Sequence, residues 1–522
     1  MKSCFSKSRP NAITCSGRFA AGAAFVLALF VSGQANAEVF RVGPGEKYGS
    51  LADVARKLSP GDEVELKGGT TYGSVLFDRH GKPGNPIVIR GVSVDGKRPI
   101  VHGGRDTIEA AGNHYVFENI EITGGSFRCF FHRAHDITLR RVVIHDCPAH
   151  GILGADEGSG SLLLEQSEIY RCGEGDKRHP IYMATDERMH PGSVFRMQFC
   201  YVHDGNGGNN IKSRAERNEI YYNWVEGALY HELELIGPDG GDPSLKREDS
   251  EVVGNVFRKT NASYSVRIGG DGTGETNGRY RFLHNTFLLE RENRAVFRLF
   301  DGVESVEMHN NVVYAMGGGP VDVIRTSDVR WSTGREQISG ANNWIPQGSR
   351  SVPSGWTGTL YGTDPGFENL RELDLRPAIG SPLRDAAAPM TVLASPPSFS
   401  FPNPLRDVAF QPPVREKGVK TLVRQSDGKP DIGAYEGGFD YVEAEPTQTM
   451  SLSGSSSGSL GPSRPGGGGG RCGCILPGEV QGGKMWFGLV MSIATAMSIG
   501  VRMRVGARRV SVGRDYAEAV RD

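Results

Sequence analysis

The chain has 522 residues with 59 Lys and Arg against 60 Asp and Glu, so its net charge is −1 and no overall basic field exists to hold a nucleic acid. Glycine is unusually abundant at 72 residues, about 14 % of the chain and about twice the usual share of ~7 %. Because glycine is a poor helix former, this composition disfavours a large helical bundle and predicts a protein of strands and turns.

The first 37 residues have the three parts of a secretory signal peptide. Basic residues such as Lys2 and Arg9 come first, an apolar run covers residues 19–31, and the small residues of Ala35–Ala37 precede Glu38. We therefore expect residues 1–37 to direct export and to be removed. An uncleaved membrane anchor is the alternative interpretation.

Eight segments between residues 117 and 313 alternate apolar and polar residues with period two, as strands do. They begin 22 to 33 residues apart, at Phe117, Leu139, Leu164, Met197, Ile220, Val252, Phe282 and Met308. The shortest interval leaves no room for a βαβ unit, so each repeat is one coil of a solenoid. The pattern predicts an all-β fold, a single parallel β-helix of about 8–11 coils.

Asn223, Asn255, Asn285 and Asn311 occupy the same position in four successive coils. A buried amide can be satisfied by hydrogen bonds to identical amides above and below it. The sequence therefore predicts an asparagine ladder. Glycines such as Gly124 follow the strands, where the coils must turn and a positive φ is needed.

Several stretches outside the repeat resemble the ends of a known fold. Residues 40–45 and 60–66 flank a segment, 50–58, that is expected to form a short N-terminal capping helix, and residues 380–385 and 431–436 lie near the other end. These stretches resemble the first and last segments of right-handed parallel β-helix proteins of the pectate-lyase-like superfamily. The resemblance implies a right-handed parallel β-helix over residues 38–440. Since the superfamily includes lyases, hydrolases, epimerases and adhesins, it does not select one activity.

Proline is concentrated late in this domain, with 12 of the 29 prolines in residues 351–440. The strands of a ladder do not tolerate that density of proline. We therefore expect an irregular C-terminal cap from about residue 317, which protects the open edge of the last coil and is not a separate catalytic domain.

The composition changes again after residue 440. Residues 441–484 are rich in Ser and Gly and contain Cys472 and Cys474, residues 485–501 are apolar, and residues 502–522 contain several arginines. We expect a flexible linker, a transmembrane or sorting helix and a basic cytoplasmic tail. This order resembles bacterial C-terminal protein-sorting tails, with an ordinary membrane anchor as the alternative. With the signal peptide, it predicts an exported protein at the cell envelope or cell surface.

Two cysteines are candidates for a disulfide. Cys147 and Cys172 each lie three residues after the last apolar residue of a strand, in consecutive coils. Neighbouring coils lie ~4.8 Å apart, within the ~4.4–6.8 Å Cα separation of a disulfide, and export favours oxidation. A disulfide between them and a pair of stacked buried thiols both stay open.

A second strand precedes several of the ladder strands, and its third residue should point outward because its second is apolar. These outward residues are Tyr182, Lys212, Glu234, Arg267 and Phe297. We expect them to form a column in which aromatic rings stack on sugars and cations pair with uronate carboxylates. The column predicts an acidic polysaccharide as the partner, and we expect the protein to be a monomer.

A uronan lyase needs a base for the proton α to the carboxylate and a cation that neutralises this carboxylate. We assign Lys212 as the base, with Glu234 beside it at the coil spacing of ~4.8 Å, and Arg267 as carboxylate clamp or proton donor. The residues assigned to substrate binding are Tyr182, Phe297, Arg214 and His231, and His231 is also an alternative base.

The stretch 207–214 carries a Lys-Ser pair and resembles the catalytic strand of the chondroitinase B and alginate lyase family. The resemblance implies a catalytic role for Lys212 and a bound calcium ion. The two calcium-binding glutamates of that family have no counterpart here, and Glu234 stands where its next arginine would be. Asp204, Asn209 and Glu232 are the candidate calcium ligands that remain.

Three functions stay open. The first is a polysaccharide lyase that acts by β-elimination. The second is a non-catalytic surface module that binds glycans, in which the charged column is an ion-pair ladder and each exposed pair contributes about 0–1 kcal/mol. The third is a uronan epimerase or a glycoside hydrolase, and the hydrolase ranks lower because the column offers one carboxylate where two are needed.

Overall fold

The computed structural model describes residues 37–237, 249–270, 278–291, 295–300, 303–326, 337–389, 405, 407–415 and 419–444. All of them belong to one unit of the chain, residues 1–455. The expected signal peptide up to residue 36, the linker from residue 445, the apolar segment 485–501 and the basic tail lie outside the described residues. Within those ranges no helix combines the length and the apolar composition needed to cross a membrane.

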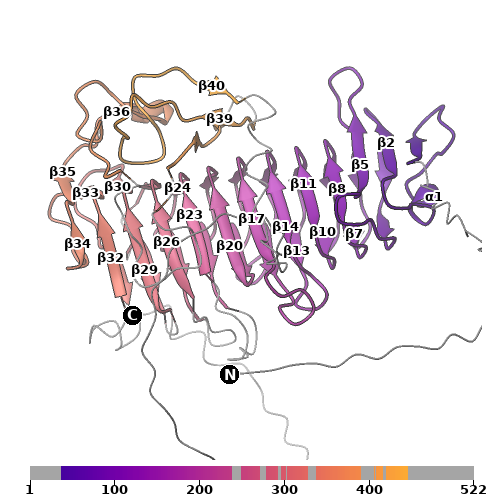
Figure 1. Ribbon diagram of the computed structural model, residues 1–522, viewed down its shortest axis with the longest axis horizontal. Coiled ribbons are helices and arrows are strands. Elements are labelled where there is room, and N and C mark those ends of the chain that lie inside the picture. Colours follow the sequence, from indigo (N-terminus) through magenta and orange to yellow (C-terminus); the bar gives the residue numbers. More distant parts are fainter. Residues whose placement is uncertain are drawn as a thin grey trace, which may run out of the picture. The chain divides into compact units, whose positions relative to one another are not determined.

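The regular structure is almost entirely β-strand, arranged in three parallel sheets that we call A, B and C (Figure 1). Successive strands along the chain join sheets A, B and C in turn, so each set of three strands makes one coil. Each strand pairs in parallel with the equivalent strand of the coils before and after it. This topology confirms the predicted all-β, single-solenoid parallel β-helix.

Sheet A consists of β1 (Val39–Val42), β2 (Glu63–Lys67), β5 (Ile87–Val92), β8 (Tyr115–Glu118), β11 (Ile137–Arg140), β14 (Leu162–Glu165), β17 (Val194–Gln198), β20 (Arg217–Tyr221), β23 (Asp249–Val253), β26 (Arg279–Leu283), β29 (Ser305–His309), β32 (Gln337–Ala341) and β34 (Trp356–Thr357). Sheet B consists of β3 (Thr71–Gly73), β6 (Ile100–His102), β9 (Glu121–Thr123), β12 (Val143–His145), β15 (Glu168–Tyr170), β18 (Tyr201–His203), β21 (Trp224–Glu226), β24 (Val256–Lys259), β27 (Thr286–Leu289), β30 (Val312–Ala315), β33 (Trp344–Pro346) and β35 (Leu360–Gly362). Sheet C consists of β4 (Val75–Phe77), β7 (Asp106–Ala110), β10 (Arg128–His132), β13 (His150–Gly154), β16 (Ile181–Ala184), β19 (Ile211–Arg214), β22 (Leu233–Leu235), β25 (Val266–Ile268), β28 (Phe297–Leu299) and β31 (Ile324–Thr326). The short helix α1 (Ala52–Ala55) lies inside the segment 50–58 where a capping helix was expected.

The core forms because each coil repeats the side-chain positions of the coil before it. In sheet B, Val225, Phe257 and Phe287 stand in register and are buried, and the two phenylalanine rings stack with centroids 5.3 Å apart. Like residues therefore lie on like residues, and one apolar core continues through the coils from Phe40 to Ile345.

The predicted asparagine ladder is confirmed, and Asn343 extends it by one coil. The side-chain Nδ2 of Asn223, Asn255, Asn285 and Asn311 each donates to Oδ1 of the next asparagine at 2.9–3.0 Å. Each acceptor Oδ1 also takes the backbone N–H of the preceding asparagine at 2.8–3.0 Å. The ladder thus satisfies buried backbone groups at the corner between sheets A and B, where no strand partner is available.

The predicted pairing of Cys147 with Cys172 is wrong. Cys147 forms a disulfide with Cys129, at a Cα separation of 5.9 Å, and Cys172 is a buried free thiol. The Cys172 sulfur donates to the Tyr170 carbonyl oxygen at 3.3 Å. The prediction compared equal positions of neighbouring coils, whereas the disulfide joins the corner residue Cys147 to Cys129 of strand β10. Burial raises the pKa of the free Cys172 thiol to about 12.

The cap begins later than residue 317 and covers more than the last coil. In the described residues, sheet C continues to β31, which ends at Thr326, sheet A to β34, which ends at Thr357, and sheet B to β35, which ends at Gly362. Five of the strands of sheet B carry outward apolar residues, Trp224, Val256, Leu288, Val312 and Trp344, which form one cluster with Leu375, Leu383, Ile432 and Tyr435 of the cap. An apolar stripe of this length needs a cover, so the cap packs along the side of sheet B.

The rest of the cap is built from short antiparallel pairs (Figure 1). They are β36 (Phe367–Asn369) with β37 (Asp374–Pro377), joined by η1 (Leu370–Glu372), and β38 (Phe410–Gln411), β39 (Leu422–Val423) and β40 (Val442–Glu443). A polar anchor holds the cap as well, because Arg415 donates to the Glu226 carboxylate at 3.3 Å. Tyr201 and Trp224 donate to the same carboxylate at 2.6 and 3.0 Å.

Replacing one ladder asparagine should destabilise the whole domain. In Asn255→Ala, the backbone N–H of Asn223 and the side chain of Asn285 lose buried partners, so we expect the free energy of unfolding to fall by about 3 kcal/mol. Urea denaturation followed by circular dichroism measures this loss. The exposed Asn206→Ala is the control, with an expected change below ~0.5 kcal/mol. Equal losses in the two variants would contradict a stabilising ladder.

Candidate functional site

The outer side of sheet C carries a row of outward side chains in register, which we call the sheet C row. Tyr182 pairs with Lys212, Lys212 with Glu234, and Glu234 with Arg267. Arg298 and Arg325 continue the row on β28 and β31. The structure therefore brings together four of the five residues that the sequence placed in this column.

The fifth assignment, Phe297, is wrong. Phe297 pairs with the inward residue Val266 and is 1 % exposed, so it belongs to the core and cannot stack on a sugar. Its ring lies against Phe282 and Phe287, with centroids 5.3 and 4.9 Å away. The sequence alignment assumed that Val296 was the inward residue of the strand. In the structure β28 begins one residue later, which turns Arg298 outward instead.

Glu234 is the centre of the sheet C row. Its side chain is 2 % exposed, and its carboxylate lies 2.5 Å from Arg267 Nη1 and 3.7 Å from Lys212 Nζ. Asn209 Nδ2 donates to the same carboxylate at 2.5 Å. A carboxylate buried to this degree is stable only when cations and donors surround it. Two cations around one carboxylate also leave the group with a net positive charge.

Arg214 lies on the same side of β19 as Lys212, but it is buried there and supports the row. It is 2 % exposed, its Nε donates to the Tyr182 hydroxyl at 3.0 Å, and its Nη1 donates to the Gly237 carbonyl at 2.9 Å. A direct contact between Arg214 and a substrate is therefore not supported, and its action on the row is to hold Tyr182. Lys212 Nζ lies 5.4 Å from the centre of the Tyr182 ring.

Exposure distinguishes this row from a second charged row on sheet A. There Glu251, Arg281 and Glu307 stand in register, and all three are 0 % exposed. In the sheet C row, the side chains of Lys212 and Arg267 are 15 % and 18 % exposed. The charges on sheet A serve packing, whereas those on sheet C can reach a ligand.

A line of four polar side chains runs beside the sheet C row, and we call it the corner row. The sequence analysis did not identify these residues as a set. It consists of His150, His179, Asn209 and His231, each three residues before an outward residue of sheet C. The backbone N–H of His179 donates to His150 Nδ1 at 3.2 Å, and that of Asn209 donates to His179 Nδ1 at 2.9 Å. The N–H of His231 donates to Asn209 Oδ1 at 3.0 Å. The constant offset of three residues is the signal that could have identified this row from the sequence.

The histidines of the corner row are neutral at physiological pH. Burial is the main reason, and it lowers the pKa of His150 and of His231 to about 4 and that of His179 well below its usual value. His231 differs from the other two because its Nδ1 lies 3.2 Å from the Tyr264 carbonyl oxygen and 3.2 Å from Ser263 Oγ. The carbonyl oxygen can only accept and the hydroxyl oxygen can accept too, so both contacts are satisfied by an Nδ1–H. His231 therefore carries its proton on Nδ1, and its Nε2 has a lone pair.

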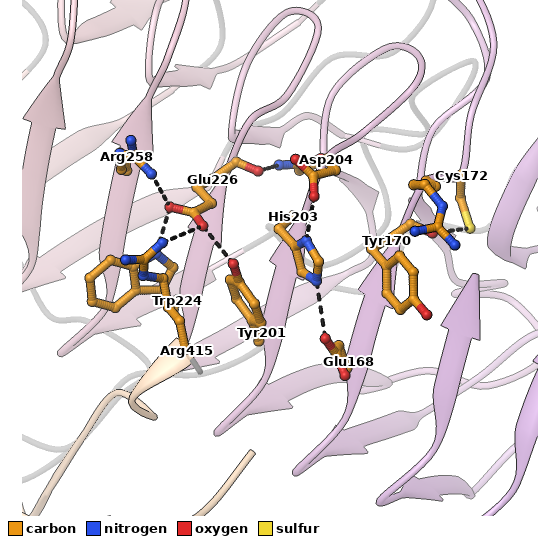
Figure 2. A network of polar contacts seen from close by, with 12 residues as sticks. Glu168, Tyr170, Cys172, Tyr201, His203, Asp204, Trp224, Glu226, Arg258 and Arg415 are labelled. Carbon is orange, nitrogen blue, oxygen red and sulfur yellow. Dashed lines mark hydrogen bonds and ion pairs between the residues drawn. The ribbon is translucent and has the colours of Figure 1, made fainter. Parts of the chain in front are cut away.

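The three candidate calcium ligands do not fit a shared site. Figure 2 shows Asp204 on the outer side of sheet B, where its Oδ2 lies 2.8 Å from His203 Nδ1. Glu168 lies 3.1 Å from Nε2 of the same ring. Burial alone would lower the pKa of His203, but these two carboxylates raise it above its usual value. The Asp204 carboxylate is thus already bound to the His203 ring.

Glu232 is 0 % exposed and contacts Lys259 Nζ at 3.2 Å and Asn210 Nδ2 at 2.7 Å, while the Asn209 amide is occupied by Glu234 and His231. Nowhere in the described part of the chain do three or more His, Cys, Asp or Glu residues form a group that could hold a metal. Asp204, Asn209 and Glu232, the predicted calcium ligands, are thus each bound to other protein groups, and the described residues do not support the predicted calcium site.

No protein-family model matches the chain, and no curated protein matches it. Among solved structures, pectate lyase Pel9A is 12 % identical with a TM-score of 0.39, over 77 % of this chain and 96 % of that chain. An alginate lyase from Paenibacillus sp. str. FPU-7 is 16 % identical with a TM-score of 0.37, over 55 % and 97 %. XylC in complex with xylose is 9 % identical with a TM-score of 0.42, over 63 % and 86 %. At these sequence identities and TM-scores, the matches do not indicate what activity this chain has.

The low pKa of His150 predicts a pH-dependent loss of stability. The unfolded chain protonates this histidine below pH ~6.5 and the folded chain only near pH 4, so its contribution is complete above ~6.5 and is lost as the pH falls toward 4. In His150→Asn, the amide oxygen can still accept the His179 N–H but no group titrates. Between pH 7.5 and 5.0 we expect wild type to lose about 2 kcal/mol more than the variant in urea denaturation. Parallel losses would show that His150 is not held neutral.

Proposed function

We propose that the protein is a polysaccharide lyase that binds an acidic, uronate-containing polysaccharide along the sheet C row and cleaves it by β-elimination. The observation that supports this most directly is the group around Glu234, in which two partly exposed cations meet one buried carboxylate. We further propose, from the sequence of the two ends, that the protein is exported and held at the cell envelope.

β-Elimination in a uronan requires three events at one sugar. A base removes the proton α to the carboxylate, negative charge moves onto that carboxylate, and the bond to the leaving oxygen breaks as a proton is supplied. The first event is the most difficult, because the carbon acid is weak until its carboxylate is neutralised. In our proposal Lys212 and Arg267 supply this neutralisation from two neighbouring strands.

The structure favours His231 over Lys212 as the base. Lys212 faces the Glu234 carboxylate as an ion-paired ammonium group, which carries no lone pair to accept a proton. His231 offers a lone pair at Nε2, and Asn209 connects it to the row by accepting its backbone N–H and donating to Glu234. In the proposed reaction, His231 Nε2 accepts the carbon proton while the cations hold the charge.

The leaving oxygen also needs a proton. Tyr182 lies next to Lys212 in the row, and Arg214 donates to its hydroxyl oxygen, so the tyrosine O–H can be directed toward a bound glycan. The hydroxyl gives its proton to the leaving oxygen as the carbon–oxygen bond breaks. The electron pair of the broken carbon–hydrogen bond becomes the new double bond of the unsaturated sugar.

A glycan-binding module without turnover remains the second candidate. Its support is that Glu234 is already satisfied by Arg267, Lys212 and Asn209, as in a structural ion-pair ladder. A hydrolase would need two facing carboxylates, whereas Glu234 is the one carboxylate among the six residues of the sheet C row named above.

Two substitutions distinguish the roles of Lys212 and His231. On pectate, alginate and glycosaminoglycan panels, we expect His231→Asn to lower kcat by about 10²–10⁴-fold, since Asn can still donate to the Tyr264 carbonyl but has no Nε2 lone pair. Lys212→Ala should lower kcat by about 10²–10³-fold, whereas Lys212→Arg keeps the charge and most of the activity. Unsaturated-uronate absorbance measures each rate.

The control is Arg133→Ala, which breaks an ion pair of 2.8 Å with Glu109 elsewhere on the outer side of sheet C and should leave kcat unchanged. Activity in His231→Asn together with its loss in Lys212→Arg would identify Lys212 as the base. Glycan binding by wild type without any unsaturated product would establish the binding module instead.

A further inference from the structure

The corner row performs two tasks with the two ring nitrogens of each histidine. His150 and His179 both use Nδ1 to accept the backbone N–H of the equivalent residue on the next coil. A nitrogen that accepts an N–H carries no hydrogen of its own, so the proton of each neutral ring is on Nε2. The fold itself therefore fixes these two histidines in the Nε2–H form.

The rings of His150 and His179 lie beside Tyr182, an outward residue of sheet C. Both residues are buried, with 6 % of His150 and 3 % of His179 exposed. Some polar atoms of the described residues are fully enclosed and lack a hydrogen-bond partner, but the two Nε2 atoms are not among them. The protein supplies no hydrogen-bond acceptor to either Nε2 in this part of the chain. Two donors of fixed direction are thus available to a ligand.

Their surroundings match one face of a sugar. The Tyr182 ring centroid lies 6.0 Å from that of His150 and 5.5 Å from that of His179, with the His179 ring nearly perpendicular to it. The ring of Phe127, the residue before β10, has its centroid 5.9 Å from that of His150. An aromatic surface bordered by uncharged donors is typical of sites that recognise the apolar face and the hydroxyl groups of a sugar.

We propose that His150 and His179 form a subsite for an uncharged oxygen of the glycan, a hydroxyl or ring oxygen of the sugar that lies over Tyr182. This inference rests on the proposed function, because the glycan must lie along the sheet C row. It divides the row into two halves of different chemistry. The half at Lys212 and Arg267 binds carboxylates by charge, and the half at Tyr182 binds through stacking and neutral donors.

Two substitutions at His179 separate the ligand contact from the structural one. His179→Asn keeps an acceptor near the position of Nδ1, as Asn209 does in the same row, and removes the Nε2–H donor. His179→Gln places an N–H near the position of Nε2 and removes the acceptor for the Asn209 N–H. The inference predicts weaker binding with unchanged stability for Asn, and lower stability with retained binding for Gln.

The measurement is calorimetric binding of oligogalacturonate and of oligoalginate to the full-length protein in a His231→Asn background, which is expected to cleave slowly. Loss of one neutral hydrogen bond should weaken binding about threefold to tenfold in His179→Asn, with less than a twofold change in His179→Gln. His80→Asn is the matched control, because His80 Nδ1 accepts the Asn113 N–H at 3.2 Å in the same way but lies outside the corner row.

An independent readout does not require a ligand. Nitrogen-15 NMR of the histidine rings should show His150 and His179 protonated on Nε2 and His231 on Nδ1. Protonation of His179 on Nδ1, or unchanged affinity in His179→Asn, would overturn this inference while leaving the proposed function intact. Absence of binding to every uronan by the parent protein would instead overturn the proposed function.

Discussion

Parallel pairing in register from coil to coil is the constraint on which the rest of this structure depends. Because every strand lies beside its equivalent in the next coil at ~4.8 Å, each side chain has its nearest neighbours one coil above and one coil below. Apolar residues gain from this arrangement, as Phe257 and Phe287 do by stacking. Polar residues must find a partner in the adjacent coil, and the asparagine ladder and the corner row are two solutions with the same geometry.

Register also makes charged columns costly unless opposite charges alternate. The sheet C row alternates from Lys212 to Glu234 to Arg267, and then continues with Arg298 and Arg325. Aromatic rings accompany this arginine stretch, since the guanidinium carbons of Arg267 and Arg298 lie 4.2 and 4.5 Å from the centre of the Phe300 ring. Places where a protein departs from the locally favoured pattern tend to be functional sites. The sheet C row departs from strict alternation at Arg298 and Arg325, and in the proposed function this is the part of the row that would meet a polyanionic glycan.

The period-two pattern and the repeat were enough to predict the coils, the asparagine ladder and most of the sheet C row, because these features depend only on alternation and spacing. Phe297 was misassigned because the strand starts one residue later than the alignment assumed, and a shift of one residue exchanges the two faces. The disulfide partner Cys129 could not be found from spacing, since it occupies a different position of the coil. The cap lies along sheet B because Trp224 and Trp344 leave an apolar stripe there, and their outward direction is visible only in the folded chain.

The corner row shows why binding and stability are difficult to separate in a β-helix. An alanine at His179 would remove both the acceptor that holds the Asn209 N–H and the Nε2–H donor, so a loss of binding would be indistinguishable from a local loss of structure. The same reasoning applies to Glu234, whose carboxylate both orders Lys212 and Arg267 and sets the local charge on the outer side of sheet C. In such a fold the ladder that supports the coils also fixes the protonation state of the groups at the surface. A ligand site on sheet C therefore needs no separate supporting layer, because the backbone of the next coil provides it.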